Sequence, residues 1–398
     1  MSKKVPQIRF NGFTDPWEER KLGDFIKISR EQEVKKVDLH EEKIGYYVLA
    51  MRTFDFEGYI DYSKPYWINN FESADDDLFL NRKEFAIIDA DMDASLPKIG
   101  KVLLNATNNK FLLAAHIRKI KVDVQVDSIF AYALMRTTEL VERLKLEANG
   151  SISKRLLDKN VYKQKVYLPI HLEEQQQIGE FFWTLEETIA LHQRKLDLLK
   201  EQKKGYLQKM FPKNGAKVPE LRFAGFADDW EERKLKDVVE KQIKGKAQFE
   251  KLAPGDVEYL DTSRLNGGQA ILTNGFKDVT LDDVLILWDG SKAGTVYHGF
   301  EGSLGSTLKA YRTSADSKFV YQYLKRHQDN IYNNYRTPNI PHVQKDFLDV
   351  FTISVPRSDE QAKIGSFFNQ IDNTIALHQR KLDLLKEQKK GFLEKMFV

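Results

Sequence analysis

The chain has 398 residues, and its 62 basic and 59 acidic side chains leave a net charge of +3. This length predicts two or three domains, and an aromatic content of 12% favours packed structure over disorder. The absence of cysteine excludes disulfide bonds, cysteine-ligated zinc, iron–sulfur clusters and a cysteine nucleophile. No apolar run approaches the length of a membrane span and no secretory signal opens the chain, so we expect a cytoplasmic protein.

Two sequence repeats organise the chain. VPQIRFNGFTDPWEERKLGDF at 5–25 returns as VPELRFAGFADDWEERKLKDV at 218–238, with 14 of 21 positions identical. TIALHQRKLDLLKEQKKG at 188–205 returns without a change at 374–391. This period is too long for a solenoid, so the chain is a two-fold duplication of one frame.

Two divergent inserts, residues 26–177 and 239–363, separate these repeats. Their composition predicts β-rich domains with some helix. In the first insert the predicted strands are 44–51, 84–90, 101–106, 111–122 and 164–169, with a helix at 128–147. In the second insert the predicted strands are 257–262, 284–289, 307–313 and 349–356, with a helix at 317–335. KIGKV (98–102) aligns with KAGTV (292–296), which suggests that the inserts are distant versions of one fold.

Basic charge gathers in both inserts. Residues 95–165 contain 14 basic and 6 acidic side chains, and residues 290–345 contain 8 basic and 3 acidic ones. Such stretches could meet a polyanion, although ordinary surface charge explains them equally well.

Each insert is followed by a long amphipathic helix. Apolar or semi-apolar residues recur at alternating spacings of four and three, which is a heptad seam. The seam residues are Ile178, Phe182, Leu185, Ile189, His192, Leu196, Leu199, Tyr206 and Met210 in the first helix, and Ile364, Phe368, Ile371, Ile375, His378, Leu382, Leu385, Phe392 and Met396 in the second. A helix over 178–210 is about 50 Å long.

Each helix must bury its apolar stripe, and its duplicate is the obvious partner. We therefore predict an α+β fold with a pseudo-two-fold repeat, in which two β-rich domains are joined by an antiparallel intramolecular coiled coil. The alternative is that each helix packs only on its own half. We expect His192 and His378 to be packed seam residues, since a metal site would need more ligands. Lys203 and Lys389 on the same seam either extend to solvent or set the register of the pair.

The sequence lacks the motifs of common catalysts. It contains no GxxxxGK[ST] phosphate loop, no GxGxxG after a strand, no GxSxG, no HExxH and no Asn/Asp-Pro-Pro-aromatic tetrapeptide of amino-methyltransferases. Carboxylates at Asp75–Asp77 or at Asp89, Asp91 and Asp93 could serve a nuclease, but they are more typical of solvated loops. We therefore predict a binding protein without a catalytic site or a metal site.

The order of motifs resembles the DNA-specificity subunit of type I restriction-modification systems over essentially the whole chain. The resemblance is carried by a tryptophan followed five residues later by leucine, Trp17 to Leu22 and Trp230 to Leu235. It is also carried by the segments PIHLEEQQQI (169–178) and PRSDEQAKI (356–364), each followed by the heptad helix. One such motif is weak, whereas this order occurring twice is specific.

This resemblance implies two target-recognition domains that each read one half of a split, asymmetric DNA sequence. The implied boundaries are 1–170 and 213–356 for the recognition domains, and 171–212 and 357–398 for the spacer helices. The resemblance further implies two methyltransferase subunits and endonuclease subunits as partners. Those partners, rather than this chain, would use S-adenosylmethionine, ATP and Mg²⁺. The helices would fix the unread spacer, and their outer faces would meet the modification subunits.

Polar side chains within the inserts are the candidates for contacting DNA. Arg and Lys favour guanine edges, Asn and Gln favour adenine, and Ser, Thr and Lys often hold phosphates. The candidates are Lys98, Lys101, Asn105, Asn108, Asn109, Lys110, Ser151, Ser153, Lys154 and Arg155 in the first insert, and Ser291, Lys292, Ser306, Thr307, Lys309, Arg336, Thr337, Asn339 and His342 in the second.

Two other functions stay open on the sequence alone. A nuclease or methyltransferase with an unrecognised site would show activity as the purified chain. A coiled-coil adaptor that joins two proteins would bind its partners with little dependence on salt, unlike a protein that contacts DNA phosphates.

Overall fold

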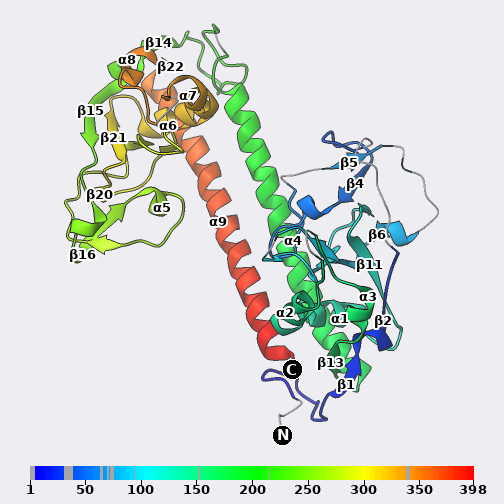
Figure 1. The fold of residues 1–398 in the computed structure, drawn as a ribbon. Helices are drawn as coiled ribbons and strands as arrows, with labels where there is room; N and C mark the ends of the chain where they lie inside the picture. Colours follow the sequence, from blue (N-terminus) through cyan, green and yellow to red (C-terminus); the bar gives the residue numbers. More distant parts are fainter. Residues whose placement is uncertain are drawn as a thin grey trace. The chain divides into compact units, whose positions relative to one another are not determined.

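A computed structural model describes residues 5–30, 39–62, 66–69, 71, 76–93, 95–150, 153–213, 215–337 and 341–398 of the chain (Figure 1). It divides into two compact units. The first unit is Met1–Asp197 with His378–Val398, and the second is Leu198–Leu377. Each unit contains one insert and a part of both long helices, α4 (Leu172–Lys209) and α9 (Ser358–Met396). None of the described helices is long and apolar enough to cross a membrane.

The described part of the first insert contains two larger sheets and a short pairing of β8 (Ala90–Asp91) with β12 (Lys154–Arg155). An antiparallel sheet has the order β2 (Ile26–Ile28), β11 (Ile117–Val122), β7 (Phe85–Ile88) and β9 (Val102–Leu104). The other sheet has the order β3 (Leu39–His40), β5 (Trp67–Ile68), β4 (Tyr46–Leu49), β10 (Phe111–Leu113) and β6 (Phe79–Leu80). The remaining elements include the helices α1 (Ser128–Met135), α2 (Thr138–Leu146) and α3 (Asp158–Tyr162).

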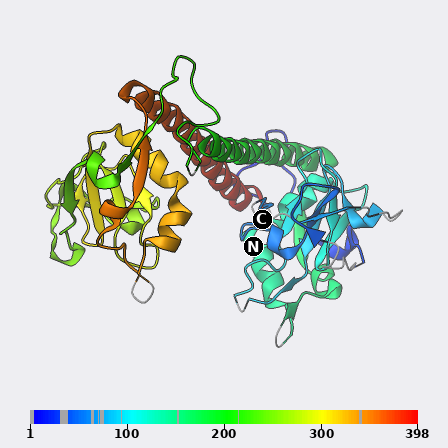
Figure 2. The same cartoon turned by 90° about the horizontal axis from the view of Figure 1, so that it is seen from above.

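The described part of the second insert repeats this plan. Its antiparallel sheet has the order β15 (Val239–Lys244), β21 (Leu308–Thr313), β18 (Val284–Leu287) and β19 (Val296–Tyr297). A smaller sheet has the order β17 (Leu272–Thr273), β16 (Pro254–Leu260) and β20 (Ser303–Leu304). The helices are α5 (Thr262–Leu265), α6 (Ser317–Arg326), α7 (Gln328–Asn334) and α8 (Phe347–Val350), and α6 packs on the antiparallel sheet (Figure 2).

The sequence predicts most of these elements, but several predicted single elements are divided in two in the structure. The predicted strand 111–122 is two strands, because a turn places His116 in the left-handed region at φ 70°. The predicted helix 128–147 breaks at Thr137, whose extended backbone begins α2. The predicted helix 317–335 breaks at His327, and the start of the predicted strand 349–356 lies in α8 before β22 (Thr352–Val355).

In each unit, the strand formed by the duplicated opening motif pairs with the last strand of the insert. Strand β1 (Glu18–Lys21) pairs with β13 (Lys165–Leu168), and β14 (Glu231–Lys234) pairs with β22. Arg9 holds the buried Glu174 carboxylate at 2.6 and 2.8 Å, and Arg222 holds Glu360 at 2.7 and 2.8 Å. These two glutamates belong to the Pro…Glu-Gln segments, so the motifs recognised in the sequence bind one another in the fold.

The glutamine of each such segment orients the helix that follows the sheet. Gln175 donates to the carbonyl of Pro169 and accepts from the N–H of Asp127, which caps α1. Gln361 makes the same two contacts with Pro356 and with Asp316, which caps α6. Both long helices carry a glycine at this crossing. A Cβ on Gly179 would lie 2.3 Å from Asp127 Oδ1, so a larger residue would push the helices apart.

Helices α4 and α9 pair antiparallel within each unit. In the first unit the rings of Phe181 and Phe392 lie 4.9 Å apart, and in the second unit those of Tyr206 and Phe367 lie 5.1 Å apart. All the predicted seam residues are buried or half-buried. The two long helices and the repeated inserts confirm the predicted fold class.

The end of each long helix completes the core around the insert of the other repeat. Phe397, which follows α9, lies 6.0 Å from the ring of Trp17 and 5.5 Å from that of Phe130. Phe211, which follows α4, lies 6.1 Å from the ring of Trp230. Each of these phenylalanines is nearly or fully buried, so each helix is anchored at both of its ends.

The seam histidines and lysines pair across the helices. The Nδ1 atoms of His192 and His378 lie 3.1 Å apart, in the first unit. Lys389 binds the Glu186 carboxylate, to which the Tyr132 hydroxyl also donates. Burial and the neighbouring Arg136 lower the pKa of Lys389 to about 7, whereas Glu186 opposes that shift. Lys203 binds Asp372 at 2.6 Å in the second unit. The lysines therefore match the register-setting alternative, since Lys389 is only 2% exposed.

Replacing Lys389 by methionine should destabilise the protein strongly. It leaves Glu186 buried without its cation, for which we expect a loss of about 3–5 kcal/mol in the free energy of unfolding. Adding Glu186→Gln should restore part of that loss. Lys203→Met is the matched control, because Lys203 and Asp372 are 15% and 31% exposed and should contribute at most about 1 kcal/mol. Urea unfolding of the variants measures this, and equal losses at the two lysines would contradict it.

Candidate nucleic-acid interface

Most of the candidate residues of the second insert meet at one place. The N–H groups of Trp288 and Asp289 both donate to the carbonyl of Thr307, at 2.8 and 3.2 Å. The N–H of Val343 donates to the carbonyl of Trp288 at 2.9 Å. The end of β18, the start of β21 and the loop before α8 therefore form one surface, named here the second strand-end patch. Its residues are Trp288, Asp289, Ser291, Lys292, Ser306, Thr307, Lys309, Arg336, Thr337 and His342.

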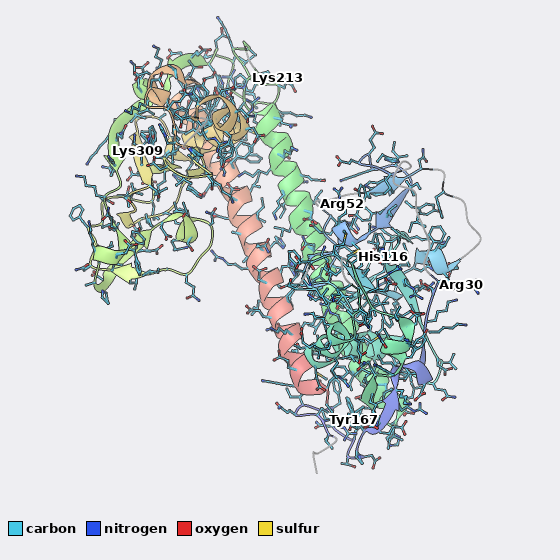
Figure 3. The ribbon with its side chains drawn as sticks, viewed as in Figure 1. Arg30, Arg52, His116, Tyr167, Lys213 and Lys309 are labelled. Carbon is cyan, nitrogen blue, oxygen red and sulfur yellow. The ribbon has the colours of Figure 1, made fainter. Side chains whose placement is uncertain are left out.

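Side chains in the second strand-end patch are held in defined positions. The Lys309 ammonium lies 3.1 Å from the centre of the Trp288 ring (Figure 3 labels Lys309). Burial lowers the pKa of Lys309. Arg336 donates to the carbonyls of Ser291 and Tyr332 at 3.0 and 2.8 Å. The Thr337 hydroxyl lies 3.0 Å from His342 Nδ1. A stack of a cation on an aromatic ring beside exposed hydroxyls suits an anionic, hydrogen-bonding ligand.

The candidates of the first insert are more scattered, and three of them support the fold. Asn105 is fully buried and donates its amide to the carbonyls of Leu80 and Asn109. Its oxygen accepts from both the N–H and the hydroxyl of Thr107, so none of its hydrogen-bonding capacity remains for DNA. Lys98 donates to the carbonyls of Met51 and Phe54. Lys101 donates to the carbonyl of Phe56, and burial lowers the pKa of Lys101.

The other candidates of the first insert lie at its surface. Asn108, Asn109 and Lys110 are exposed in the turn between β9 and β10, with the Lys110 ammonium 4.1 Å from the centre of the Phe79 ring. Ser153 precedes β12, which contains Lys154 and Arg155 and pairs with β8. Ser151 and Asn339 lie outside the described residues.

Sequence analysis missed a cluster around His116. His116 Nδ1 lies 3.2 Å from Asp89 Oδ1 and 3.0 Å from Arg155 Nη2 (Figure 3). Arg118 lies 3.4 Å from Asp89 and forms a two-armed ion pair with Asp158. We name Asp89, His116, Arg118 and Arg155 the first strand-end patch. The signal in the sequence is a histidine inside the apolar segment 111–122, which the sequence predicts as a single strand.

The carboxylates considered for a nuclease have structural partners. Asp89 contacts His116 and Arg118, and Asp91 accepts the N–H groups of Asp93 and Lys98 at 3.1 and 2.9 Å. Among the described residues, no three His, Cys, Asp or Glu side chains gather in a way that could hold a metal ion. Asp75, the first residue of the other carboxylate run, lies outside the described part.

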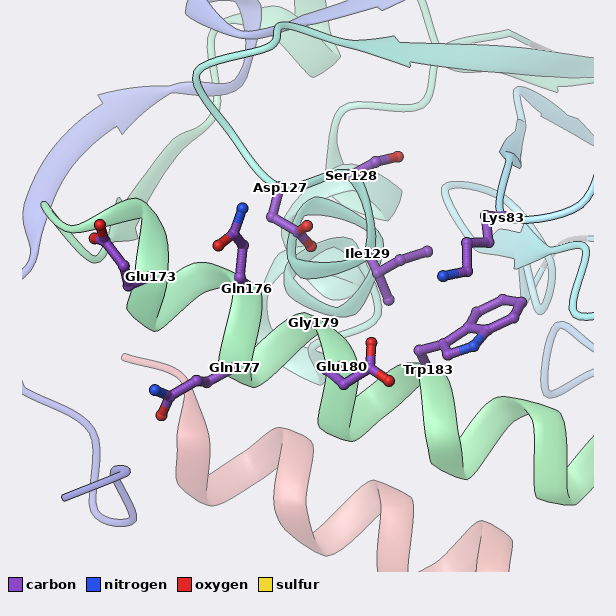
Figure 4. A pocket seen from close by; sticks show the side chains of 10 residues that line it. All are labelled: Lys83, Asp127, Ser128, Ile129, Glu173, Gln176, Gln177, Gly179, Glu180 and Trp183. Carbon is purple, nitrogen blue, oxygen red and sulfur yellow. The ribbon is translucent and has the colours of Figure 1, made fainter.

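A pocket of about 660 Å³ opens where the start of α1 meets the first turns of α4 (Figure 4). Its lining includes the carboxylates of Asp127, Glu173 and Glu180 and the single ammonium of Lys83. The Lys83 ammonium lies 4.8 Å from the centre of the Trp183 ring. A lining with this excess of negative charge disfavours phosphate, so we do not assign the pocket to DNA.

Comparison with known proteins identifies the architecture. The family model described as the type I restriction modification DNA specificity domain matches residues 14–201 and again residues 227–387. The chain belongs to this family. The two matches cover both inserts together with most of each copy of the frame, so the duplication seen in the sequence is a duplication of the specificity domain.

Named relatives and a solved structure agree with this membership. The chain is 31% identical over 195 residues to the type I restriction enzyme MjaVIII specificity subunit of Methanocaldococcus jannaschii, covering 46% of this chain and 44% of that protein. It is 21% identical to the MjaX specificity subunit of the same organism, covering 95% of this chain and 92% of the relative. The crystal structure of a type I S subunit from M. genitalium shares the fold, with a TM-score of 0.73 at 15% identity over 99% of both chains.

Replacing Asn105 by alanine should affect stability rather than specificity. It removes four hydrogen bonds and leaves buried groups unpaired, for which we expect a loss of about 1–3 kcal/mol in unfolding free energy. Asn108→Ala, in the exposed part of the same turn, should change stability by less than about 0.5 kcal/mol. Chemical unfolding measures both variants. A stable Asn105→Ala protein with an altered DNA sequence preference would assign Asn105 to recognition instead.

Proposed function

We propose that this chain is the non-catalytic DNA-recognition subunit of a type I restriction-modification complex. Each insert reads one half of a split DNA target. Methyltransferase subunits that bind the chain use S-adenosylmethionine, and endonuclease subunits use ATP and Mg²⁺, in the cytoplasm of a prokaryote. The observation that carries this proposal is the family match to both halves of the chain, each of which joins a divergent insert to a nearly identical frame.

The functional boundaries follow the frame. We propose residues 1–170 and 213–356 as the recognition domains, and 171–212 and 357–398 as the spacer segments. The long helices occupy Leu172–Lys209 and Ser358–Met396, which supports this division. Because the two inserts share a strand order but present different polar side chains, they suit two unrelated half-sites rather than a palindrome.

The outer faces of the long helices suit the modification subunits. Leu191 of α4 and its duplicate Leu377 of α9 are 66% and 65% exposed. Leu198 and Leu384, one heptad further along, are also exposed. Apolar side chains repeated at a spacing of seven on a helix surface favour docking of a partner helix.

Methylome sequencing tests the function. Cells that carry this chain with a compatible modification subunit should gain a split, asymmetric motif with N6-methyladenine in both halves. Exchanging residues 26–165 for the corresponding segment of a relative should change one half-site and leave the other intact. A change of both half-sites would contradict the proposal that each insert reads one half-site by itself. No new motif from a demonstrated complex would favour the protein–protein adaptor.

Helix length should determine the spacer of the target. Seven residues of α-helix span about 10 Å, which corresponds to about three base pairs at 3.4 Å each. Deleting one heptad from both α4 and α9 at matched positions should therefore shorten the unread spacer by about three base pairs. The same methylome measurement checks this, and altered half-sites with an unchanged spacer would contradict it.

A further inference from the structure

The register of the strands matches the two inserts residue by residue. Ile88 of β7 pairs with Ile117 of β11, and Leu287 of β18 pairs with Leu308 of β21. In each insert these residues form the pair at the carboxyl end of the central strand. The residues that follow the central strands, Asp89 and Trp288, are therefore equivalent. The residues that precede the next paired strands, His116 and Thr307, are equivalent in the same way.

Backbone hydrogen bonds around these residues are also shared. The N–H of Asp89 donates to the carbonyl of His116, and the N–H of Trp288 donates to the carbonyl of Thr307. The N–H of Leu156 donates to the carbonyl of Asp89, and the N–H of Val343 donates to the carbonyl of Trp288. Arg155 and His342, which precede Leu156 and Val343, are consequently equivalent. The same register matches Arg118 with Lys309.

The aligned segments KIGKV and KAGTV follow this register too. The N–H of Gly100 donates to the carbonyl of Ile88, and that of Gly294 donates to the carbonyl of Leu287. The two strand-end patches thus have one backbone framework, and they differ in side chains. His116, Arg155 and Arg118 in the first patch correspond to Thr307, His342 and Lys309 in the second.

We propose that these equivalent positions are the specificity-determining residues of the two inserts, an inference that rests on the proposed function. His116 and Arg155 read base edges of the first half-site, and Thr307 and His342 read those of the second. Arg118 and Lys309 are positioning residues, held by carboxylates in one patch and by the Trp288 ring in the other. Because arginine binds the O6 and N7 atoms of guanine, the first half-site contains a guanine opposite Arg155.

Two further observations favour this surface over the turn between β9 and β10. His116 adopts φ 70°, a conformation that is rare for residues other than glycine and that concentrates at functional sites. In the second insert, the described candidate residues come from three segments: the end of β18, the start of β21 and the loop before α8. These three segments meet at the second strand-end patch. A shared backbone with different polar side chains also explains how one fold reads two sequences.

The test uses the complete methyltransferase complex and an oligonucleotide duplex that carries the methylated motif. Each base of the motif is replaced in turn, and binding is measured at constant salt. Arg155→Ala should abolish the preference for one guanine in the first half-site. The expected loss of discrimination is about 5- to 150-fold, which corresponds to about 1–3 kcal/mol. Discrimination in the second half-site should stay unchanged. Thr307→Ala with His342→Ala should give the reciprocal result.

Matched variants separate recognition from folding. Asn108→Ala with Lys110→Ala, in the exposed turn of the same insert, should leave discrimination unchanged at every position. Arg155→Lys keeps the charge but loses the two-armed geometry, so it should weaken the guanine preference while the complex still assembles. Assembly and thermal melting of each complex report on folding.

The outcomes distinguish this inference from the proposed function. If the patch variants assemble and discriminate as the unaltered chain does, the assignment of the specificity residues is wrong, while the proposed function stands. Loss of discrimination in the turn variant instead would also overturn the assignment. If the unaltered complex shows no split motif, the proposed function itself fails.

Discussion

The structure depends on the burial of the phenylalanine that follows each long helix in the core of the other repeat. Phe397 packs between Trp17 and Phe130, and Phe211 packs beside Trp230 and Phe319. Removing such a side chain from a core costs several kcal/mol, so neither insert has a complete core without a helix from the other half of the sequence. The antiparallel pairing of α4 and α9 follows directly, because each helix begins at its own insert and ends at the other.

Polar pairs then define how the helices meet. Apolar seams tolerate sliding by a heptad, whereas an ion pair between named positions does not. Lys389 with Glu186 and Lys203 with Asp372 are the same pair in the two units, formed in each case by one residue from each helix. The pair in the first unit is buried with Tyr132, and the pair in the second also receives a hydrogen bond from Gln322. In the first unit this pair is buried charge, whose cost in desolvation is offset by the surrounding hydrogen bonds.

The inserts show how one backbone can carry two specificities. Their central sheets have the same strand order and the same hydrogen bonds at the strand ends, although their sequences show little similarity. The core positions need only apolar side chains of suitable size, so the sequences could diverge widely while the fold persisted. On the proposed function, the polar side chains at the strand ends are constrained instead by the DNA half-site that each insert reads.

The duplication, the heptad seams and the β-rich inserts follow from the sequence alone, because these are properties of spacing and composition along the chain. The order of the duplicated motifs adds the resemblance to the family. The sequence also named residues of the second insert that lie in segments that meet, among them Lys292, Thr307 and His342. It failed where contacts between distant segments decide the outcome. Asn105 is buried and binds the carbonyl of Leu80 on β6, and His116 meets Asp89 and Arg155 only through the fold. The choice between a solvent-exposed Lys389 and one that fixes the register was likewise made by burial, which depends on packing between segments that lie far apart in the chain.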